Sequence, residues 1–348
     1  MSAESPDCHA FPRITFGIIV LNGEPFNTFN LRALYPHAHK IIVVEGAAPG
    51  ARSIASADGH SVDETLAVLR RFKEQEDPEG KVQIVVAEDE GHADGFWPGE
   101  KHEQARAFAR RATGDFLWQV DIDEFYRPAD MASVRQYLRE NPDTAGATFR
   151  QMTFWGGPDV VVDGLYLRRG AGNYHRLFRW GEGYRYDTHR PPTVLNASGQ
   201  NLRATKDWLE VSKTLNLGWK LFHYSLLFRQ QVADKCTYYA EAEWSAREDA
   251  MAWYESDFLG LRRPFRVHNV YDHLSWLEPY DSVHPPAPAE MLEHAANTGT
   301  LTRGTEDART MMSTASYRAG RTCLKGLSSV DRFLRAGFRL VRRGRWSE

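Results

Sequence analysis

The sequence predicts an α/β protein in which a mainly parallel sheet is covered by helices on both faces. Apolar, β-branched segments without polar alternation recur near the start of the chain, which is the pattern of strands buried on both sides. Segments with helical apolar spacing lie between them. Four such strands alternating with helices within about 125 residues are typical of a doubly wound α/β arrangement.

The first strand is predicted in ITFGIIVL, which begins at Ile14. The turn residues NGEP break it, and FNTFNLRALY continues with helical spacing. KIIVVEG, from Lys40, repeats the strand pattern, so the three segments predict one βαβ unit. The Ala-, Gly- and Ser-rich residues 47–59 should form a loop at the carboxyl end of the second strand, where such sheets bind ligands.

The next helix is predicted to open at Ser61, with Glu64 three residues later as in a capping box. KVQIVVAE follows as a third strand. KHEQARAFARRATG should form an amphipathic helix that ends at Gly114, and FLWQV is the fourth strand, which leads directly into DIDEFY.

The pattern changes beyond Asn141 to shorter strands, such as ATFRQMTFW and YHRLFRW, which predict a mixed α+β region. An aromatic helical stretch, CTYYAEAEWSAREDAMAWYESDF, and a basic amphipathic end follow. We therefore expect an N-terminal extension (1–13), a half built on the parallel sheet (14–130), a mixed α+β half (131–290) and a helical basic tail (291–348).

Composition narrows the function classes. The 348 residues are 42% hydrophobic and 26% charged, as in a folded globular protein, and a formal net charge of -3 argues against a nucleic-acid partner. Three cysteines without Cys-x-x-Cys spacing predict neither a disulfide framework nor a structural zinc site. The start of the chain has no basic, apolar leader, and its longest apolar run is too short to span a bilayer. A cytoplasmic protein is expected.

The sharpest chemical signal is WQVDIDEFY. Asp121 and Asp123 are two residues apart at the end of an apolar strand, so both carboxylates can face one divalent cation at the sheet edge. Oxygen ligands suit Mg²⁺ or Mn²⁺, which would also bridge a substrate diphosphate. Replacing either by Ala should then abolish activity and leave the fold intact. The alternative is a pair of solvated loop acids.

The run GDFLWQVDIDEFY resembles the metal-binding segment of GT-A glycosyltransferases, especially family-two-like enzymes with an Asp-x-Asp-Glu-Phe motif. FGIIVLNGEPF and KIIVVEG resemble their nucleotide-binding βαβ unit, so the likeness covers about the first 130 residues. It implies a GT-A fold and a metal-dependent hexosyl- or N-acetylhexosaminyltransferase that uses a UDP- or GDP-sugar. The acceptor would be a glycan, a lipid-linked glycan or another hydroxyl group.

The same resemblance implies residue roles. Where relatives carry Asp-Asp-x-Ser after the second strand, this chain has Glu-Gly-Ala-Ala, so the resemblance does not identify the nucleotide base. Glu45 would lie against the base or ribose, and Leu21 and Asn22 would touch the nucleoside. The implied nucleotide-sugar positions are Leu21, Asn22, Glu45, Lys101, Gln104, Asp121 and Ile122. Lys101 and Gln104 could equally be helix-surface residues that face water.

Two residues of the second half complete the expected donor site. His223, in LFHYS, is a candidate third metal ligand, because imidazole binds manganese and related enzymes take a histidine from this half. Lys235 would neutralise the leaving diphosphate. The alternatives are a core histidine and a surface lysine.

Inverting transfer needs a carboxylate that accepts the proton of the acceptor hydroxyl. Asp187, in the turn-rich GYRYDTHRPP, is favoured over Glu124, which alternates to the face opposite the aspartates. Trp155 and His189 are the candidate acceptor contacts, Trp155 through its flat apolar face. Each of these residues could instead have a structural role.

Rival functions use similar sheets. A nucleotidyltransferase or metal-dependent phosphotransferase should carry a phosphate-binding glycine loop, and neither Gly-x-x-x-x-Gly-Lys-Ser/Thr nor Gly-x-Gly-x-x-Gly occurs. A non-catalytic, transferase-like scaffold is the other alternative. Finally, the basic amphipathic segment from Ser316 could lie on the inner face of a membrane as a peripheral contact, or equally pack on the catalytic domain.

Overall fold

The computed structural model describes residues 11–99, 101–240, 249–270 and 272–344, with side chains up to residue 331. The expected extension of residues 1–13 lies almost wholly outside them. The chain forms two compact units. Unit 1 comprises Met1–Gln151, Asn173–His223 and Val283–Leu301, and unit 2 comprises Met152–Gly172, Tyr224–Ser282 and Thr302–Glu348. The units therefore interleave along the chain, whereas the sequence analysis divides it into consecutive segments.

Unit 1 is built on a parallel sheet. All four predicted strands are present, and they lie in the order β3-β2-β1-β4, as in the first half of a doubly wound fold. The α/β fold class expected from the sequence is therefore confirmed. These strands are β1 (Ile14–Val20), β2 (Lys40–Glu45), β3 (Val82–Val85) and β4 (Phe116–Asp121).

Antiparallel strands extend this sheet beyond β4. β8 (Asn173–Arg179) pairs with β4, and the first part of β6 (Gly146–Trp155) pairs with β8. The short β5 (Glu124–Phe125) pairs with β12 (Lys220–Leu226), and β11 (Trp208–Leu209) pairs with β6. The predicted strands ATFRQMTFW and YHRLFRW correspond to β6 and β8.

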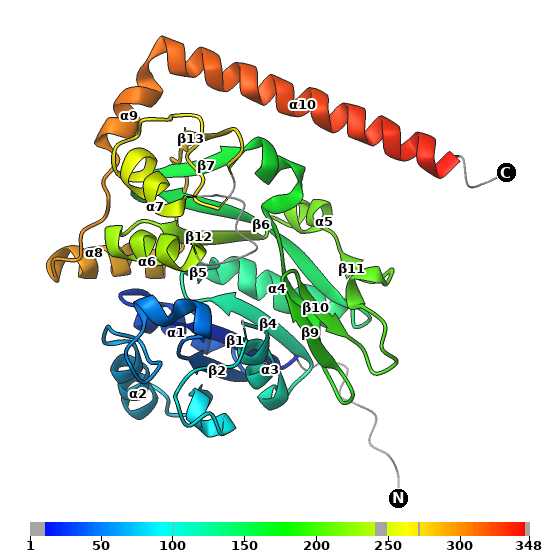
Figure 1. Ribbon diagram of the computed structural model, residues 1–348. Helices are drawn as coiled ribbons and strands as arrows, with labels where there is room; N and C mark the ends of the chain where they lie inside the picture. Colours follow the sequence, from blue (N-terminus) through cyan, green and yellow to red (C-terminus); the bar gives the residue numbers. More distant parts are fainter. Residues whose placement is uncertain (1–10, 100, 241–248, 271, 345–348) are drawn as a thin grey trace, which may run out of the picture. The chain divides into compact units, whose positions relative to one another are not determined.

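Helices cover both faces of the parallel strands (Figure 1). On one face, apolar residues of α1 (Phe26–Leu34), α2 (Thr65–Gln75) and α4 (Pro128–Glu140) share a core with Phe16 and Ile18. On the other face, α3 (Lys101–Arg111) packs against Ile19 and Val44. Alternate residues of β1 thus enter two separate cores, which explains why its sequence is apolar throughout.

Gly17 sets the distance between β1 and α3. A Cβ atom at this position would lie 2.5 Å from the ring of Phe108 in α3, closer than real contacts allow. Glycine therefore permits the helix to pack directly on the strand.

The start of α2 differs from the expectation. The helix begins at Thr65, its cap residue Glu64 makes no side-chain cap hydrogen bond, and the predicted capping box from Ser61 is absent. Ser61 instead donates its hydroxyl hydrogen bond to Glu45, 2.8 Å away. The Ser61 hydroxyl pairs with the buried Glu45 carboxylate rather than with the end of the helix. A buried carboxylate that lacks a hydrogen-bond partner costs more free energy than a helix that lacks a side-chain cap.

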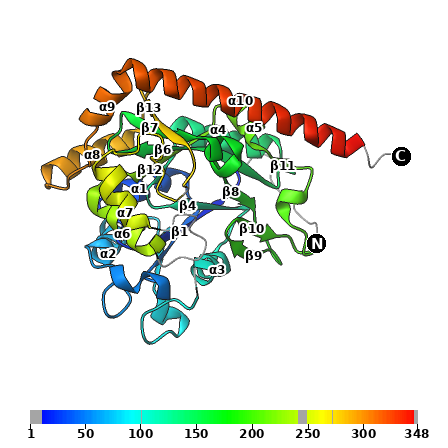
Figure 2. The ribbon, with the colours of Figure 1, turned by 45° about the horizontal axis from the view of Figure 1, so that its top comes forward.

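The remaining elements of unit 1 follow the sheet. β9 (Arg185–His189) and β10 (Pro192–Leu195) form a hairpin (Figure 2). Tyr186 packs edge-on against Phe108 of α3 at 5.5 Å between ring centres. α5 (Val211–Asn216) and α8 (Pro286–Asn297) complete this unit.

Unit 2 has its own core, centred on the tryptophans Trp155, Trp253 and Trp276. Here β7 (Val160–Gly164) pairs with β13 (Ser275–Pro279) and with the second part of β6. The helices are α6 (Arg229–Ala240), α7 (Ala250–Trp253), α9 (Glu306–Ser313) and α10 (Ala315–Gly344). The predicted aromatic helical stretch falls on α6 and α7, apart from residues 241–248, which lie outside the described residues. No helix in the described residues is both long and apolar enough to cross a bilayer.

Candidate functional site

The predicted aspartates lie at the carboxyl edge of the parallel sheet. Asp121 is the last residue of β4 and pairs in register with Ile19 of β1, while Glu45 at the end of β2 pairs with Val20. Asp123 follows in the turn between β4 and β5. Because parallel strands end at the same edge, the residues after β1, β2 and β4 meet there, as the βαβ pattern predicts.

His223 reaches Asp123 from a distant part of the chain. β12 runs antiparallel to β5 with His223 opposite Glu124. This register brings His223 Nε2 to 3.1 Å from Asp123 Oδ1. The side chains are 14% and 7% exposed, so the pair is nearly buried. The other ring nitrogen of His223, Nδ1, is buried without a hydrogen-bond partner among the described residues.

Arg176, which no sequence motif singled out, binds Asp121. Arg176 lies in β8 beside β4, its side chain is 3% exposed, and its Nη2 donates to Asp121 Oδ2 at 2.6 Å. The same nitrogen donates to Glu124 Oε1. The available signal was an arginine inside the apolar strand YHRLFRW, since a buried arginine requires an acidic partner.

Glu124 supports this cluster from within. It has no exposed surface, and its Oε2 accepts a hydrogen bond from the backbone N–H of Asp121 at 3.1 Å. Burial raises the pKa of Glu124 to about 7, against the opposing charge of Arg176. Both carboxylate oxygens serve internal contacts, so the sequence-based alternative of Glu124 as catalytic base does not fit its position. Side chains alternate between the two faces of an extended segment, so Glu124 points away from the face of the two aspartates and into the protein interior.

Asp121 is held in its charged form. Burial alone would raise its pKa, but the charges of Arg176 and Lys101 lower the pKa to about 2. Its side chain remains 36% exposed. Lys101, at the start of α3, therefore lies within electrostatic reach of the aspartate.

His189 lies next to the same charges. Its ring is almost buried, and burial together with Lys101 and Arg190 holds its pKa well below the ordinary value. It is therefore neutral near pH 7. Its backbone N–H donates to His102 Nδ1 at 3.0 Å, which ties β9 to α3. The 8% exposure of His189 leaves it little surface for the expected acceptor contact.

Asp187, two residues earlier, is accessible. Its carboxylate is 40% exposed and stands 4.0 Å from Arg185. The register of β9 with β10 shifts at this point, so Asp187 has no paired residue on β10. Bulges of this kind redirect side chains beside functional sites.

The expected nucleoside contact of Glu45 is not available. Glu45 is fully buried, and its Oε1 accepts from both the backbone N–H and the hydroxyl of Ser61 at 2.8 Å. Its Oε2 lies 2.8 Å from His60 Nδ1. Glu45 therefore anchors the loop after β2 to the sheet edge. Glu45 is the first residue of Glu-Gly-Ala-Ala, the segment in which this chain differs from the Asp-Asp-x-Ser of the family that it resembles.

Two further expected donor contacts also shape loops. Gln104 is 2% exposed and donates to the carbonyl of Gly46 at 2.8 Å, so its expected reach to the donor is not met. Asn22 donates from Nδ2 to Ile54 and accepts at Oδ1 from Val62. Leu21 and Ile122 lie half-buried at the same sheet edge.

The other two predicted residues belong to unit 2. Trp155 has no exposed surface and lies in the core of that unit, where Arg303 stands 4.4 Å over its ring. Its faces are covered, so the expected stacking on an acceptor does not fit this position. Lys235 donates from Nζ to the hydroxyl of Ser225 at 2.7 Å.

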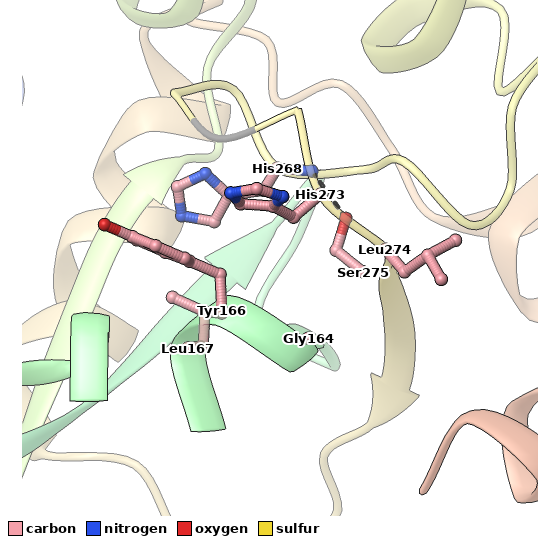
Figure 3. A pocket seen from close by; sticks show the side chains of 7 residues that line it. All are labelled: Gly164, Tyr166, Leu167, His268, His273, Leu274 and Ser275. Atoms are coloured by element: carbon pink, nitrogen blue, oxygen red, sulfur yellow. Dashed lines mark hydrogen bonds between the residues drawn. The ribbon is translucent and has the colours of Figure 1, made fainter. Parts of the chain in front are cut away.

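Unit 2 also contains a small pocket (Figure 3). The ring of Tyr166 stacks on that of His273 at 4.9 Å between centres. The cavity volume is about 10 Å³, which is room for about one water molecule. The pocket is too small for a sugar. It is lined by Gly164, Tyr166, Leu167, His268, His273, Leu274 and Ser275.

The metal expected from the motif can be tested against this geometry. Among the described residues, no group of three or more His, Cys, Asp or Glu side chains is arranged as a complete metal shell. The pair of Asp123 and His223 nevertheless fits two adjacent ligands. Neighbouring ligands of an octahedral ion at about 2.1 Å stand about 3.0 Å apart, and the observed separation is 3.1 Å. Asp121 stays bound to Arg176 instead.

No family model and no curated protein matches this chain. Among solved structures, S. aureus TarS 1-349 is similar at 14% identity and a TM-score of 0.28, with 42% of this chain and 38% of that chain covered. The mannosyltransferase PcManGT from Pyrobaculum calidifontis, in complex with GDP-Man and Mn²⁺, is similar at 15% identity and a TM-score of 0.38, with 94% and 88% covered.

Glucosyl-3-phosphoglycerate synthase from Mycobacterium tuberculosis, in complex with Mn²⁺, UDP and glucosyl-3-phosphoglycerate, is similar at 13% identity and a TM-score of 0.29. It is covered over 45% of its length, by 42% of this chain. In these two comparisons the chain covers less than half of TarS 1-349 and of the synthase, whereas it covers 72% of TarS 1-349 in complex with UDP.

Proposed function

We propose that this protein is a metal-dependent glycosyltransferase of the GT-A type, which moves a sugar from a UDP- or GDP-sugar to a hydroxyl acceptor. The observation that carries the proposal is the contact between Asp123 and His223. An Asp-x-Asp motif at the end of a central parallel strand receives, from 100 residues away, a histidine whose Nε2 lies 3.1 Å from the second aspartate. If the two aspartates were solvated loop acids, no imidazole would be expected to lie nearly buried beside one of them, because burial of a polar group costs free energy.

In this proposal Asp123 and His223 hold the divalent ion, Mn²⁺ or Mg²⁺. The ion would supply positive charge to the donor diphosphate as the sugar leaves. His223 can serve as a ligand in its neutral form, because Nδ1 then carries the proton and Nε2 keeps a free lone pair.

Asp121 has a separate role. Arg176 engages its Oδ2, and the low pKa keeps the carboxylate charged at neutral pH. Its exposed portion is then a fixed acceptor for hydroxyl groups of the donor sugar or ribose. Lys101 places a positive charge at the same edge, where a diphosphate would be neutralised.

Asp187 is the proposed base of an inverting reaction, since its carboxylate is exposed and lies in the strand that also carries His189 near Lys101 and Asp121. The acceptor is proposed to be a glycan, free or lipid-linked. A hexosyl or N-acetylhexosaminyl group is the proposed sugar class, and the cytoplasm the proposed compartment.

The test is release of nucleoside diphosphate from a panel of UDP- and GDP-sugars, with Mn²⁺, with Mg²⁺ and with a chelator. Asp123→Asn and His223→Ala should each reduce Mn²⁺-dependent turnover at least tenfold and shift the Mn²⁺ titration to higher concentration. Asp94→Asn, an exposed aspartate at 66% side-chain exposure, is the matched control and should behave as wild type.

Two outcomes would contradict the proposal. If the chelator leaves turnover unchanged, the reaction does not need a metal ion. If the Mn²⁺ titration of His223→Ala matches that of wild type, His223 is a structural residue and not a ligand. A parallel reaction with nucleoside triphosphates and sugar phosphates tests the rival class, because a nucleotidyltransferase would release pyrophosphate rather than nucleoside diphosphate.

A further inference from the structure

The long helix α10 docks on unit 2 through one face of its first half. Tyr317 is 4% exposed, and its ring stacks on Phe265 at 4.9 Å between centres. One turn later, Arg321 Nη1 lies 3.3 Å from Glu278, and Lys325 Nζ lies 2.6 Å from the same carboxylate. These contacts fix the rotation of the helix about its own axis.

The same face continues to Ser328, which is 3% exposed. Asp331 accepts two hydrogen bonds from Arg169, at 2.9 and 3.0 Å. Tyr317, Leu324 and Ser328 recur at helical spacing, and the packing of Leu324 against the unit 2 core belongs to this face. The docked face is therefore continuous over the described side chains of the helix.

The apolar stripe of α10 lies elsewhere. Leu327 is 53% exposed, Val330 is 57% exposed, and Cys323 is exposed as well. At about 100° per residue, the stripe of Cys323, Leu327 and Val330 is rotated by about 120° from the docked face. Packing on unit 2 thus leaves it uncovered by the described residues.

The sequence continues this stripe at the same spacing, with Leu334, Phe338 and Val341. It also concentrates positive charge. Residues 316–348 hold nine Lys and Arg and two acids, in a chain whose formal net charge is -3. Figure 2 shows α10 as one long helix at the C-terminal end of the chain.

We propose that the face of α10 that carries Cys323, Leu327 and Val330 binds an anionic lipid surface. Amphipathic helices with exposed apolar stripes and arginine-rich polar faces lie in the plane of such surfaces. Charge decides between this occupant and a second copy of the chain. Two such helices would bring two strongly basic segments together and repel each other, whereas anionic headgroups neutralise them. This proposal does not depend on the transfer reaction.

The test uses the full chain and its co-sedimentation with vesicles of phosphatidylcholine and phosphatidylglycerol, compared with phosphatidylcholine alone, at low and high salt. Wild type should sediment with the anionic vesicles at low salt and be released at high salt. The double variant Leu327→Glu/Val330→Glu should lower the partition coefficient by more than about 25-fold, which is the most that two added acids would cost by charge alone.

The matched control adds the same charge outside the stripe. Thr322→Glu/Ser329→Glu changes two exposed positions of α10 and leaves the stripe apolar. By charge alone, each added acid should lower partition by about fivefold at most. The control should therefore bind better than the stripe variant, and at high salt, where charge is screened, the difference between the two variants should persist.

Three results would overturn the proposal. The first is wild-type protein that stays in the supernatant with anionic vesicles at low salt. The second is an equal loss of binding in both double variants, because charge alone would then explain binding and the apolar stripe would contribute nothing. The third is a concentration-dependent dimer in light scattering that Leu327→Glu/Val330→Glu abolishes, since a second copy would then cover the stripe. Circular dichroism and the melting temperature should be unchanged in both variants, because all four positions are exposed.

Discussion

Arg176 Nη2 lies 2.6 Å from Asp121 Oδ2, so the first aspartate of the motif is bound to a buried cation before any ligand arrives. The guanidinium also binds Glu124, whose carboxylate in turn accepts from the backbone of Asp121. The turn after β4 is thereby closed by a three-residue charge cluster. This cluster positions Asp121 and leaves Asp123 to His223.

Arg176→Met should strongly destabilise unit 1. The change removes the only cation in hydrogen-bond contact with Asp121 and Glu124 among the described side chains, and breaking a buried ion pair costs about 3–5 kcal/mol. Urea unfolding should show this loss in the free energy of unfolding. Arg185→Met is the control, because its side chain is 68% exposed and the change should stay within about 0.5 kcal/mol. A loss below about 1 kcal/mol for Arg176→Met would contradict a structural role for the cluster.

Asp121→Ala should cost stability as well as activity. The sequence alone predicted an intact fold for this variant, as for Asp123→Ala, but the contact with Arg176 changes the expectation. Loss of one partner of a buried charged group should lower the free energy of unfolding by about 1–3 kcal/mol. Asp121→Asn retains a hydrogen-bond acceptor for Arg176 and should recover part of this loss. Equal stability of wild type and Asp121→Ala would disprove the coupling.

Two glycine substitutions should have opposite effects. Gly17→Ala places a Cβ atom 2.5 Å from the ring of Phe108, and such overpacking costs about 1–3 kcal/mol. Gly326→Ala lies in helix α10, where the new Cβ meets no atom within 4 Å apart from its chain neighbours and the helix's own backbone, and it should stabilise the helix by about 0.5–1 kcal/mol. Thermal unfolding of both variants measures the contrast. A neutral Gly17→Ala would mean that α3 can move away from β1.

His60 should make stability depend on pH. Its ring nitrogens lie 2.8 Å from Glu45 and 3.1 Å from Glu88. Burial works against its charged form, but the hydrogen bond with Glu45 and the charges of Glu45, Glu88 and Asp58 raise its pKa above 6.5. Because the folded pKa is raised, the contribution is complete below pH 6.5 and is lost as pH rises through the folded value.

The comparison of wild type with His60→Asn isolates this contribution. The difference in the free energy of unfolding should be largest at about pH 5.5–6, which is up to about one pH unit below the ordinary histidine pKa. The difference should shrink as the pH rises through the pKa of His60 in the folded protein. A difference that grows with pH would reverse the assigned direction.

Local sequence determined the core of unit 1. The continuous apolar runs of β1, β2 and β4 required cover on both faces, and the helical spacing between them supplied it, so the strands and their parallel arrangement followed from periodicity. The position of Asp121 at a sheet edge followed as well, since it is the first acid after an apolar strand. These features depend on residues close together in the chain.

Tertiary structure decided which partners those residues have. Asp121 and Arg176 are 55 residues apart, and Asp123 and His223 are 100 apart. Each contact depends on the register of one strand against another, and a shift by one residue would turn the side chain to the opposite face. The same holds for Glu45, which the loop at Ser61 buries. The sequence determined the elements and the sheet edge at which the acids lie, whereas long-range strand pairing decided which acid is held by a cation, which one meets a histidine and which one is buried.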